Sequence, residues 1–203
     1  MNVASSNAQP ASHWKRFRTL YLILALCAAP VIASYTAYYF LPPSGRTNYG
    51  DLIEPQRPLP ALTLHELDGR AVDAAALRGR WLMVQVDGGD CADPCQRKLW
   101  KMRQVRLTTG KDADRVERVW LISDSAPLPT IVMREYEGTR FLRASPAELA
   151  SFLALPPDTD RRLSDHIWII DPLGNLMLRW PKDADPSRMK RDLSKLLSVS
   201  GIG

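Results

Sequence analysis

Residues 81–106 constrain the fold of this chain more than any other stretch. Trp81–Val86 is a continuous apolar run rich in Val and Leu, which predicts a strand buried on both faces. A glycine-containing loop then leads to Cys91 and Cys95, four positions apart. Apolar residues recur at three- and four-residue spacing from Cys95 to Arg106, which predicts an amphipathic helix with a solvated basic face. The order is therefore strand, loop, cysteine pair and helix.

This arrangement predicts a chemical role for the cysteines. If Cys95 lies in the first turn of the helix, the free backbone N–H groups and the helix dipole favour a thiolate there. A thiol with an ordinary pKa of about 8.5 then becomes a usable nucleophile or soft-metal ligand. Asp87, Asp90 and Asp93 crowd the same loop. Their charges oppose the helix effect, although solvated loop polarity is the commoner reason for such residues.

A second feature divides the chain, because no charge occurs between Thr19 and Leu41. As a helix with a rise of about 1.5 Å per residue, this run is long enough for a hydrocarbon core of about 30 Å. Three basic residues precede it: Lys15, Arg16 and Arg18. We therefore expect residues 1–18 to be a cytoplasmic tail and residues 19–41 a single transmembrane helix. The alternative is a cleaved signal peptide, but the run is long and lacks a clear small-x-small cleavage site.

This orientation places the larger part of the chain in the periplasm, anchored to a bacterial inner membrane. In an oxidising compartment the pair Cys91/Cys95 can form a disulfide, either inert or redox-active. The third cysteine, Cys27, lies in the apolar run and follows bulky Leu26, so we interpret it as an apolar filler and not as a lipidation site.

The charge distribution gives no case for nucleic-acid binding. The formal net charge is +5, but three of the 27 basic residues and none of the 22 acidic ones lie in residues 1–43. The remainder of the chain is therefore nearly neutral, unlike a nucleic-acid-binding domain. There is no glycine-rich phosphate loop, zinc-binding spacing or Ser-His-Asp pattern.

The rest of the chain predicts a thioredoxin-like α/β domain over residues 59–203, preceded by a proline-rich tether over 42–58. Further strands are expected at 62–65, 116–122, 166–170 and 176–180, and further helices at 130–136, at 147–153 behind a Ser145/Glu148 capping box, and after Asp185. The early β–α–β unit predicts parallel strands, and the late hairpin adds antiparallel ones. The result is a central mixed sheet flanked by helices.

The motif Cys91-Ala-Asp-Pro-Cys95-Gln-Arg-Lys-Leu99-Trp-Lys-Met102 resembles that of the Sco/SenC proteins, which are membrane-anchored, thioredoxin-like factors in cytochrome oxidase assembly. Their motif is Cys-x-x-x-Cys followed by a helix with Leu and Met at these offsets, and Ala92 and Gln96 stand here where the family usually has proline. Asp165-His166 stands before the hairpin, as does the family's Asp-His segment with its third copper ligand. The resemblance implies a copper site of Cys91, Cys95 and His166, and a cytochrome c oxidase subunit or another assembly factor as partner.

Three functions remain open. A copper chaperone for the oxidase requires the reduced dithiol and His166, a donor set that suits copper. A thiol–disulfide oxidoreductase requires only the cysteines, with Cys91 expected to be the more exposed and the nucleophile. A non-catalytic assembly scaffold would hold a lasting disulfide. A chaperone is favoured over a classical enzyme, and the alternative interpretation of His166 is a partly buried polar residue at the start of a strand.

Overall fold

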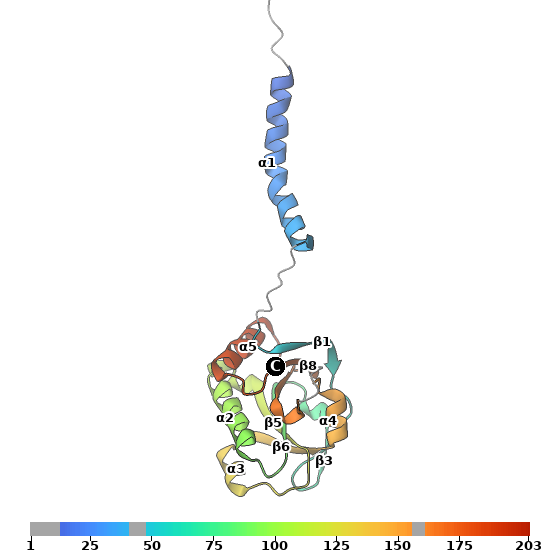
Figure 1. The fold of residues 1–203 in the computed structure, drawn as a ribbon, viewed down its shortest axis with the longest axis vertical. Helices are drawn as coiled ribbons and strands as arrows, with labels where there is room; N and C mark the ends of the chain where they lie inside the picture. The colour runs from blue at the N-terminus through green and yellow to red at the C-terminus, as the bar shows by residue number, and fades with distance from the viewer. Residues whose placement is uncertain (1–12, 41–47, 156–160) are drawn as a thin grey trace, which may run out of the picture. The chain divides into compact units, whose positions relative to one another are not determined.

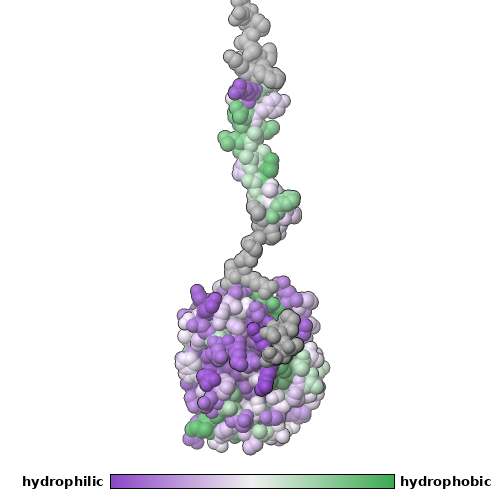
Figure 2. All heavy atoms as spheres, viewed as in Figure 1, coloured by the Kyte–Doolittle hydropathy of each residue, from purple (hydrophilic) through white to green (hydrophobic). Residues whose placement is uncertain are grey.

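The computed structural model describes residues 13–40, 48–155 and 161–203, and the chain divides into two units, residues 1–47 and 48–203. The first unit contains the helix α1 (His13–Phe40). Within it, Phe17–Phe40 is long and apolar enough to cross a membrane. Figure 2 shows green, apolar residues along much of this helix. The expected tail falls largely on residues 1–12, which lie outside the described residues, as do the side chains of Lys15 and Arg16.

The second unit is built on one mixed sheet of eight strands in the order β1-β8-β7-β4-β5-β6-β2-β3. Figure 1 shows the sheet with helices packed against it. The strands β4, β5 and β6 pair in parallel, and all other pairs are antiparallel. Their bounds are β1 Asp51–Pro58, β2 Thr63–His65, β3 Ala71–Asp73, β4 Trp81–Asp87, β5 Val116–Ile122, β6 Thr139–Ala144, β7 Ile167–Ile170 and β8 Asn175–Trp180. The predicted thioredoxin-like class, a central mixed sheet flanked by helices, is confirmed.

Helices cover both faces of this sheet. On one face α2 (Asp93–Leu107) and α5 (Pro186–Val199) pack through Met102, Val105, Met189 and Leu193. On the other face α4 (Pro146–Phe152) packs through Leu149 and Phe152. The remaining helices are short: α3 (Thr130–Glu135) and the 3₁₀ turns η1 (Ala74–Leu77), η2 (Gly110–Arg115) and η3 (Leu163–Asp165).

Successive side chains of the strand β4 point alternately to the two faces of the sheet. Met83 points into the cluster beneath α2 and α5, whereas Val84 points into the cluster beneath α4. All seven residues of β4 are buried, so the predicted two-sided burial is confirmed.

The expected tether over 42–58 needs correction, because residues 51–58 form the edge strand β1, which pairs with β8. Pro55 and Pro58 favoured an extended linker in the sequence, but an edge strand needs hydrogen bonds on one side only and tolerates proline. The pairing of β1 with β8 is interrupted by a register shift between Leu52 and Arg57. The unit therefore starts at Asn48 rather than at residue 59. Residues 42–47 lie outside the described residues.

Two further expectations near β6 differ from the structure. The strand β6 itself was not expected, because Arg140 and Arg143 interrupt its apolar pattern. The side chain of Ser145 makes no capping hydrogen bond to α4. Glu148 instead accepts hydrogen bonds from the backbone N–H and the hydroxyl of Thr63, each at 3.1 Å, and so joins α4 to β2.

Candidate redox site

Cys91 and Cys95 form a disulfide at the junction between the loop that follows β4 and the start of α2, and their Cα atoms are 5.1 Å apart. The helix begins at Asp93, so Cys95 lies in its first turn, as predicted. Cys91 lies in the preceding loop with φ of 42°, in the left-handed region that residues other than glycine rarely adopt. The site thus combines a helix N-terminus with a tightly constrained loop.

Two glycines allow this loop to approach the segment that follows β5. A Cβ atom on Gly89 would lie 2.3 Å from the carbonyl oxygen of Ala126, and one on Gly88 would lie 2.5 Å from Oδ2 of Asp124. The backbone N–H of Gly89 donates a hydrogen bond of 2.9 Å to Oδ1 of Asp124. Glycine is therefore required here for close backbone approach, which fixes the position of Cys91.

Both cysteines are buried, with exposed fractions of 1% for Cys91 and 3% for Cys95. The expectation that Cys91 is the more exposed cysteine is therefore wrong, because Cys91 is packed into a buried apolar cluster. An apolar cluster backs the disulfide and includes Leu99, Trp120, Ile122, Val132 and Tyr136. Sγ of Cys95 also accepts a hydrogen bond from Nε2 of Gln85 in β4, at 3.4 Å.

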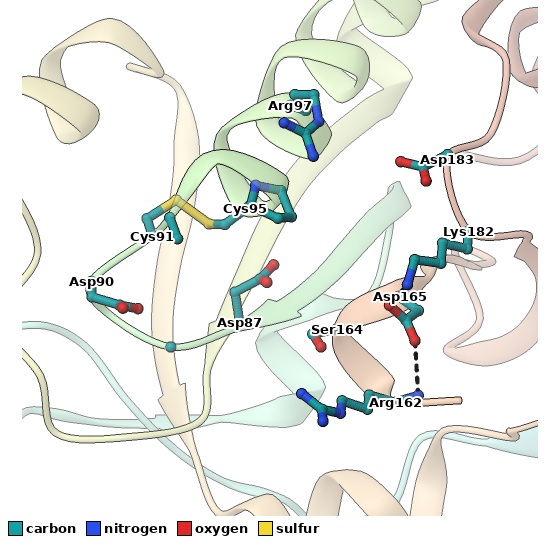
Figure 3. A pocket seen from close by; sticks show the side chains of 13 residues that line it. Asp87, Asp90, Cys91, Cys95, Arg97, Arg162, Ser164, Asp165, Lys182 and Asp183 are labelled. Atoms are coloured by element: carbon teal, nitrogen blue, oxygen red, sulfur yellow. Dashed lines mark hydrogen bonds and ion pairs between the residues drawn. A yellow bond between two sulfur atoms is a disulfide. The ribbon is translucent and has the colours of Figure 1, made fainter. Parts of the chain in front are cut away.

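A polar cavity of about 850 Å³ opens beside the disulfide. Figure 3 shows the disulfide on one side of it and Lys182 and Asp183 on the other. Arg97 of α2, the loop between β4 and α2, and the segment around η3 also line it. The ammonium group of Lys182 pairs with Asp165 at 3.1 Å. Charges of both signs thus surround an opening that reaches two otherwise buried sulfur atoms.

A buried ion pair between Lys98 and Asp87 lies at the edge of this cavity, which Asp87 lines. Nζ of Lys98 lies 2.5 Å from Oδ2 of Asp87 and 2.5 Å from the carbonyl oxygen of Ser164, so one ammonium group joins α2, β4 and η3. Burial raises the pKa of Asp87 to about 6, although Lys98 acts in the opposite direction. Burial lowers the pKa of Lys98. The expectation that Lys98 belongs to a solvated basic face is therefore wrong.

The structure does not bring His166 to the cysteine pair. Its ring is fully buried and packs edge-on against Trp168 at 5.7 Å between centroids. Trp168 points into the cluster beneath α4, whereas Cys95 belongs to α2, which covers the opposite face of the sheet. His166 does not line the cavity, and no group of three His, Cys, Asp or Glu suited to a metal ion occurs within residues 13–40, 48–155 and 161–203. The predicted three-residue copper set is not assembled in the disulfide-bonded state.

The hydrogen bonding of His166 shows which nitrogen carries the proton. Nδ1 lies 2.9 Å from the carbonyl oxygen of Trp180, which can only accept, so Nδ1 donates. Burial lowers the pKa of this imidazole, which keeps it neutral. Nε2 is then a buried acceptor, and no described residue donates to it.

Two residues of this site were missed from the sequence. Gln85 is a single amide within an apolar strand, and this polar interruption was the available signal. The partnership of Lys98 with Asp87 had no such signal, since both residues also suit a solvated loop and helix face.

The fold and the site define a thioredoxin-like protein with its cysteine pair at the N-terminus of the helix after a central strand. The sequence of residues 81–200, more than half of the chain, matches the family described as "Transmembrane-like, thioredoxin-like, C-terminal domain". The chain belongs to this family. No curated protein matches the sequence significantly.

Solved structures with the same fold include Sco proteins. The copper-bound ScoI of Bradyrhizobium japonicum is 21% identical over 68% of this chain and 98% of its own, with a TM-score of 0.50. The apo Sco1 protein of Thermus thermophilus is 16% identical over 77% and 99%, with a TM-score of 0.56. A thiol:disulfide interchange protein from a Bacteroides species is 12% identical over 70% and 90%, with a TM-score of 0.50. The predicted resemblance to Sco proteins is thus confirmed for the fold.

Proposed function

We propose that this chain is a membrane-anchored, Sco-like assembly factor for cytochrome c oxidase that acts by reversible thiol–disulfide exchange through Cys91 and Cys95. The observation that carries the proposal is the disulfide at the first turn of α2, reached through a polar cavity of about 850 Å³. A disulfide that only staples loops needs neither the helix N-terminus nor the cavity.

The proposed reaction proceeds in two substitutions. A thiolate of a partner protein attacks one sulfur of the Cys91–Cys95 bond, that bond breaks, and its electron pair goes to the other sulfur, which later takes up a proton. A second partner thiolate then attacks the mixed disulfide and releases the second cysteine. The partner is oxidised by two electrons to a disulfide, and this chain is reduced to the dithiol. The reverse reaction reduces a partner disulfide.

The proposed location is a bacterial inner membrane, with the N-terminus in the cytoplasm and the second unit in the periplasm. The apolar helix α1 supports anchoring, and the basic residues before it support this orientation. Cysteines of an oxidase subunit or of another assembly factor are the proposed partner thiols.

Copper delivery is a second candidate, favoured by the donor chemistry of the reduced pair. Two thiolates four positions apart are soft ligands that suit copper as a cargo. The atoms of His166 partly fit a ligand role as well, because Nδ1 is fixed on a carbonyl oxygen and Nε2 is without a partner among the described residues. Its place on the Trp168 side of the sheet does not fit. Coordination by all three residues therefore requires movement of His166.

The experiment that tests exchange uses the oxidised full chain in detergent, with Cys27→Ala to remove the remaining free thiol. A reduced dithiol peptide is added, and both products are quantified after acid quenching. We expect one peptide disulfide for each Cys91/Cys95 dithiol formed. A non-catalytic scaffold predicts no turnover.

Copper binding is tested on the same variant after reduction, by thiolate-to-copper absorption with Cu(II) added stepwise. Tight binding of one equivalent, lost in Cys91→Ser, supports the copper-handling candidate. No stoichiometric binding contradicts it and leaves the exchange proposal intact.

A further inference from the structure

Gln85 has a buried side-chain amide in which the nitrogen is hydrogen-bonded to a described residue and the oxygen is not. The side chain is fully buried in β4, between Val84 and Val86. Its Nε2 donates to Sγ of Cys95 at 3.4 Å, whereas its Oε1 is buried and receives no hydrogen bond from any residue in the described ranges. Among the residues that the structure describes, a sulfur atom of the cysteine pair is thus the only protein group that this amide binds.

Stability alone does not account for this residue. A buried polar atom without a partner costs free energy, whereas an apolar side chain of similar size would fill the same space without that cost. The other side chains of β4 from Trp81 to Val86 are apolar, including Met83 and Val84. A side chain that lowers stability in a central strand is most simply explained by an effect on the group it contacts.

The two cysteines differ in their polar surroundings. Hydrogen bonds near Cys91 involve its backbone only: its carbonyl oxygen accepts from Nε2 of Gln96 at 3.0 Å, and its N–H donates to Gly88 at 3.3 Å. Within the part of the chain that the structure describes, no donor is assigned to Sγ of Cys91. Cys95 has both the amide of Gln85 and its place in the first turn of α2.

We infer that Gln85 is a positioning residue for thiol–disulfide exchange, which makes Cys95 the leaving sulfur and Cys91 the sulfur that the partner attacks. The inference rests on the proposed function and specifies how that site works. A partner thiolate forms a new S–S bond with Cys91, the Cys91–Cys95 bond breaks, and the electron pair leaves on Sγ of Cys95. The N–H of Gln85 and the N-terminus of α2 stabilise this charge.

The free end of the amide is consistent with this role. An amide offers both a donor and an acceptor, whereas a disulfide sulfur can only accept. Once Cys95 is a thiol, its S–H is a donor and Oε1 of Gln85 is an acceptor without a partner in the oxidised state. The same side chain can therefore serve both states of the released sulfur.

The test compares Gln85→Leu with the parent in the full chain carrying Cys27→Ala. The equilibrium constant for reduction by glutathione is measured, together with the thermal unfolding midpoint of the oxidised form. We expect the reduced form to be disfavoured about tenfold, equivalent to about 30 mV for a two-electron couple. The unfolding midpoint should stay level or rise, because the unpaired Oε1 is gone.

Gln104→Leu is the matched control, since Gln104 lies on α2 nine positions beyond Cys95 and carries the same chemical change. It should leave the equilibrium constant unchanged. An unchanged constant for Gln85→Leu, with a lower unfolding midpoint, would show a structural role and overturn the inference.

The attacked sulfur is identified separately, by brief reaction of the oxidised parent with glutathione, acid quenching and peptide mass spectrometry. The inference predicts glutathione on Cys91 and is contradicted by glutathione mainly on Cys95. If the parent is not reduced by glutathione or by a dithiol peptide, the proposed function itself fails. If the parent exchanges but Gln85→Leu behaves identically, only the inference about Gln85 fails.

Discussion

Lys98 and Asp87 form a buried ion pair, 2.5 Å between Nζ and Oδ2, that ties the cysteine-bearing helix to the end of the central strand. The same ammonium group donates a hydrogen bond to the carbonyl oxygen of Ser164, so it also fixes the η3 segment that lines the cavity. The pair therefore links the stability of the domain to the shape of the cavity beside the disulfide.

Removing one partner of this pair should destabilise the protein strongly. Lys98→Met leaves the carboxylate of Asp87 buried without its cation, a change that costs about 3–5 kcal/mol in comparable pairs. The measurement is the free energy of unfolding of the second unit in detergent, followed by tryptophan fluorescence in urea. The control is Arg70→Ala, which removes an exposed pair with Glu66 and should lower the free energy of unfolding far less than Lys98→Met does. Equal losses in the two variants would contradict a buried role for Lys98.

Asp87 should also make stability depend on pH in an unusual direction. Its folded-state pKa of about 6 lies above the ordinary value of 3.8, so the folded state binds more protons between these values. The contribution of Asp87 is thus fully present below about pH 4 and is lost as pH rises through about 6. Unfolding free energies across pH 4–7, compared with Asp87→Asn, should show this decline only in the parent. A parent that gains stability relative to Asp87→Asn over this range contradicts the assignment.

The glycine loop should not accept a side chain. In Gly89→Ala the new Cβ would meet the carbonyl oxygen of Ala126 at 2.3 Å, so the loop must shift at a cost of about 1–3 kcal/mol. Gly201→Ala is the control, because no atom lies within 4 Å of its added Cβ. The thermal unfolding midpoint and the rate of disulfide reduction by dithiothreitol should both change in Gly89→Ala alone. Identical behaviour of the two variants would argue against a tightly packed loop.

We expect that substitution of His166 leaves thiol–disulfide exchange nearly unchanged. His166→Gln keeps an N–H donor for the carbonyl oxygen of Trp180, and residue 166 lies outside the cavity. The rate of exchange with a dithiol peptide should therefore change by less than about threefold, which is about 0.7 kcal/mol at about 1.4 kcal/mol per tenfold change. Copper titration of the reduced variant then distinguishes the candidates. A loss of copper affinity means that His166 moves to the metal in the reduced state, whereas unchanged affinity means that the cysteines act without it.

The core of the fold could be predicted because its signals are local. The apolar run of β4, the glycines after it and the spacing of Leu99 and Met102 each depend on a few neighbouring residues. The edge strand β1 and the strand β6 could not be identified, because proline in one and arginine in the other suit a strand only in the context of the sheet. Burial of Lys98 likewise depends on tertiary contacts from two other segments.

The face of the sheet on which His166 lies could have been predicted from the alternation of side chains along β7. Alternation along β7 puts Ile167 and Ile169 beneath α2 and α5 and Trp168 on the opposite face. By the same period of two, His166 shares the face of Trp168. Proximity of the Asp-His segment to the hairpin was thus insufficient to predict a shared site with Cys91 and Cys95.

The reduction potential of the Cys91–Cys95 disulfide tests the central claim most directly. The oxidised full chain carrying Cys27→Ala is equilibrated with glutathione and dithiothreitol buffers, and the dithiol fraction is measured by alkylation and mass spectrometry. Reversible exchange predicts a potential between about −300 and −120 mV, the range of redox-active pairs. A potential below about −300 mV would identify a structural bridge and contradict the account.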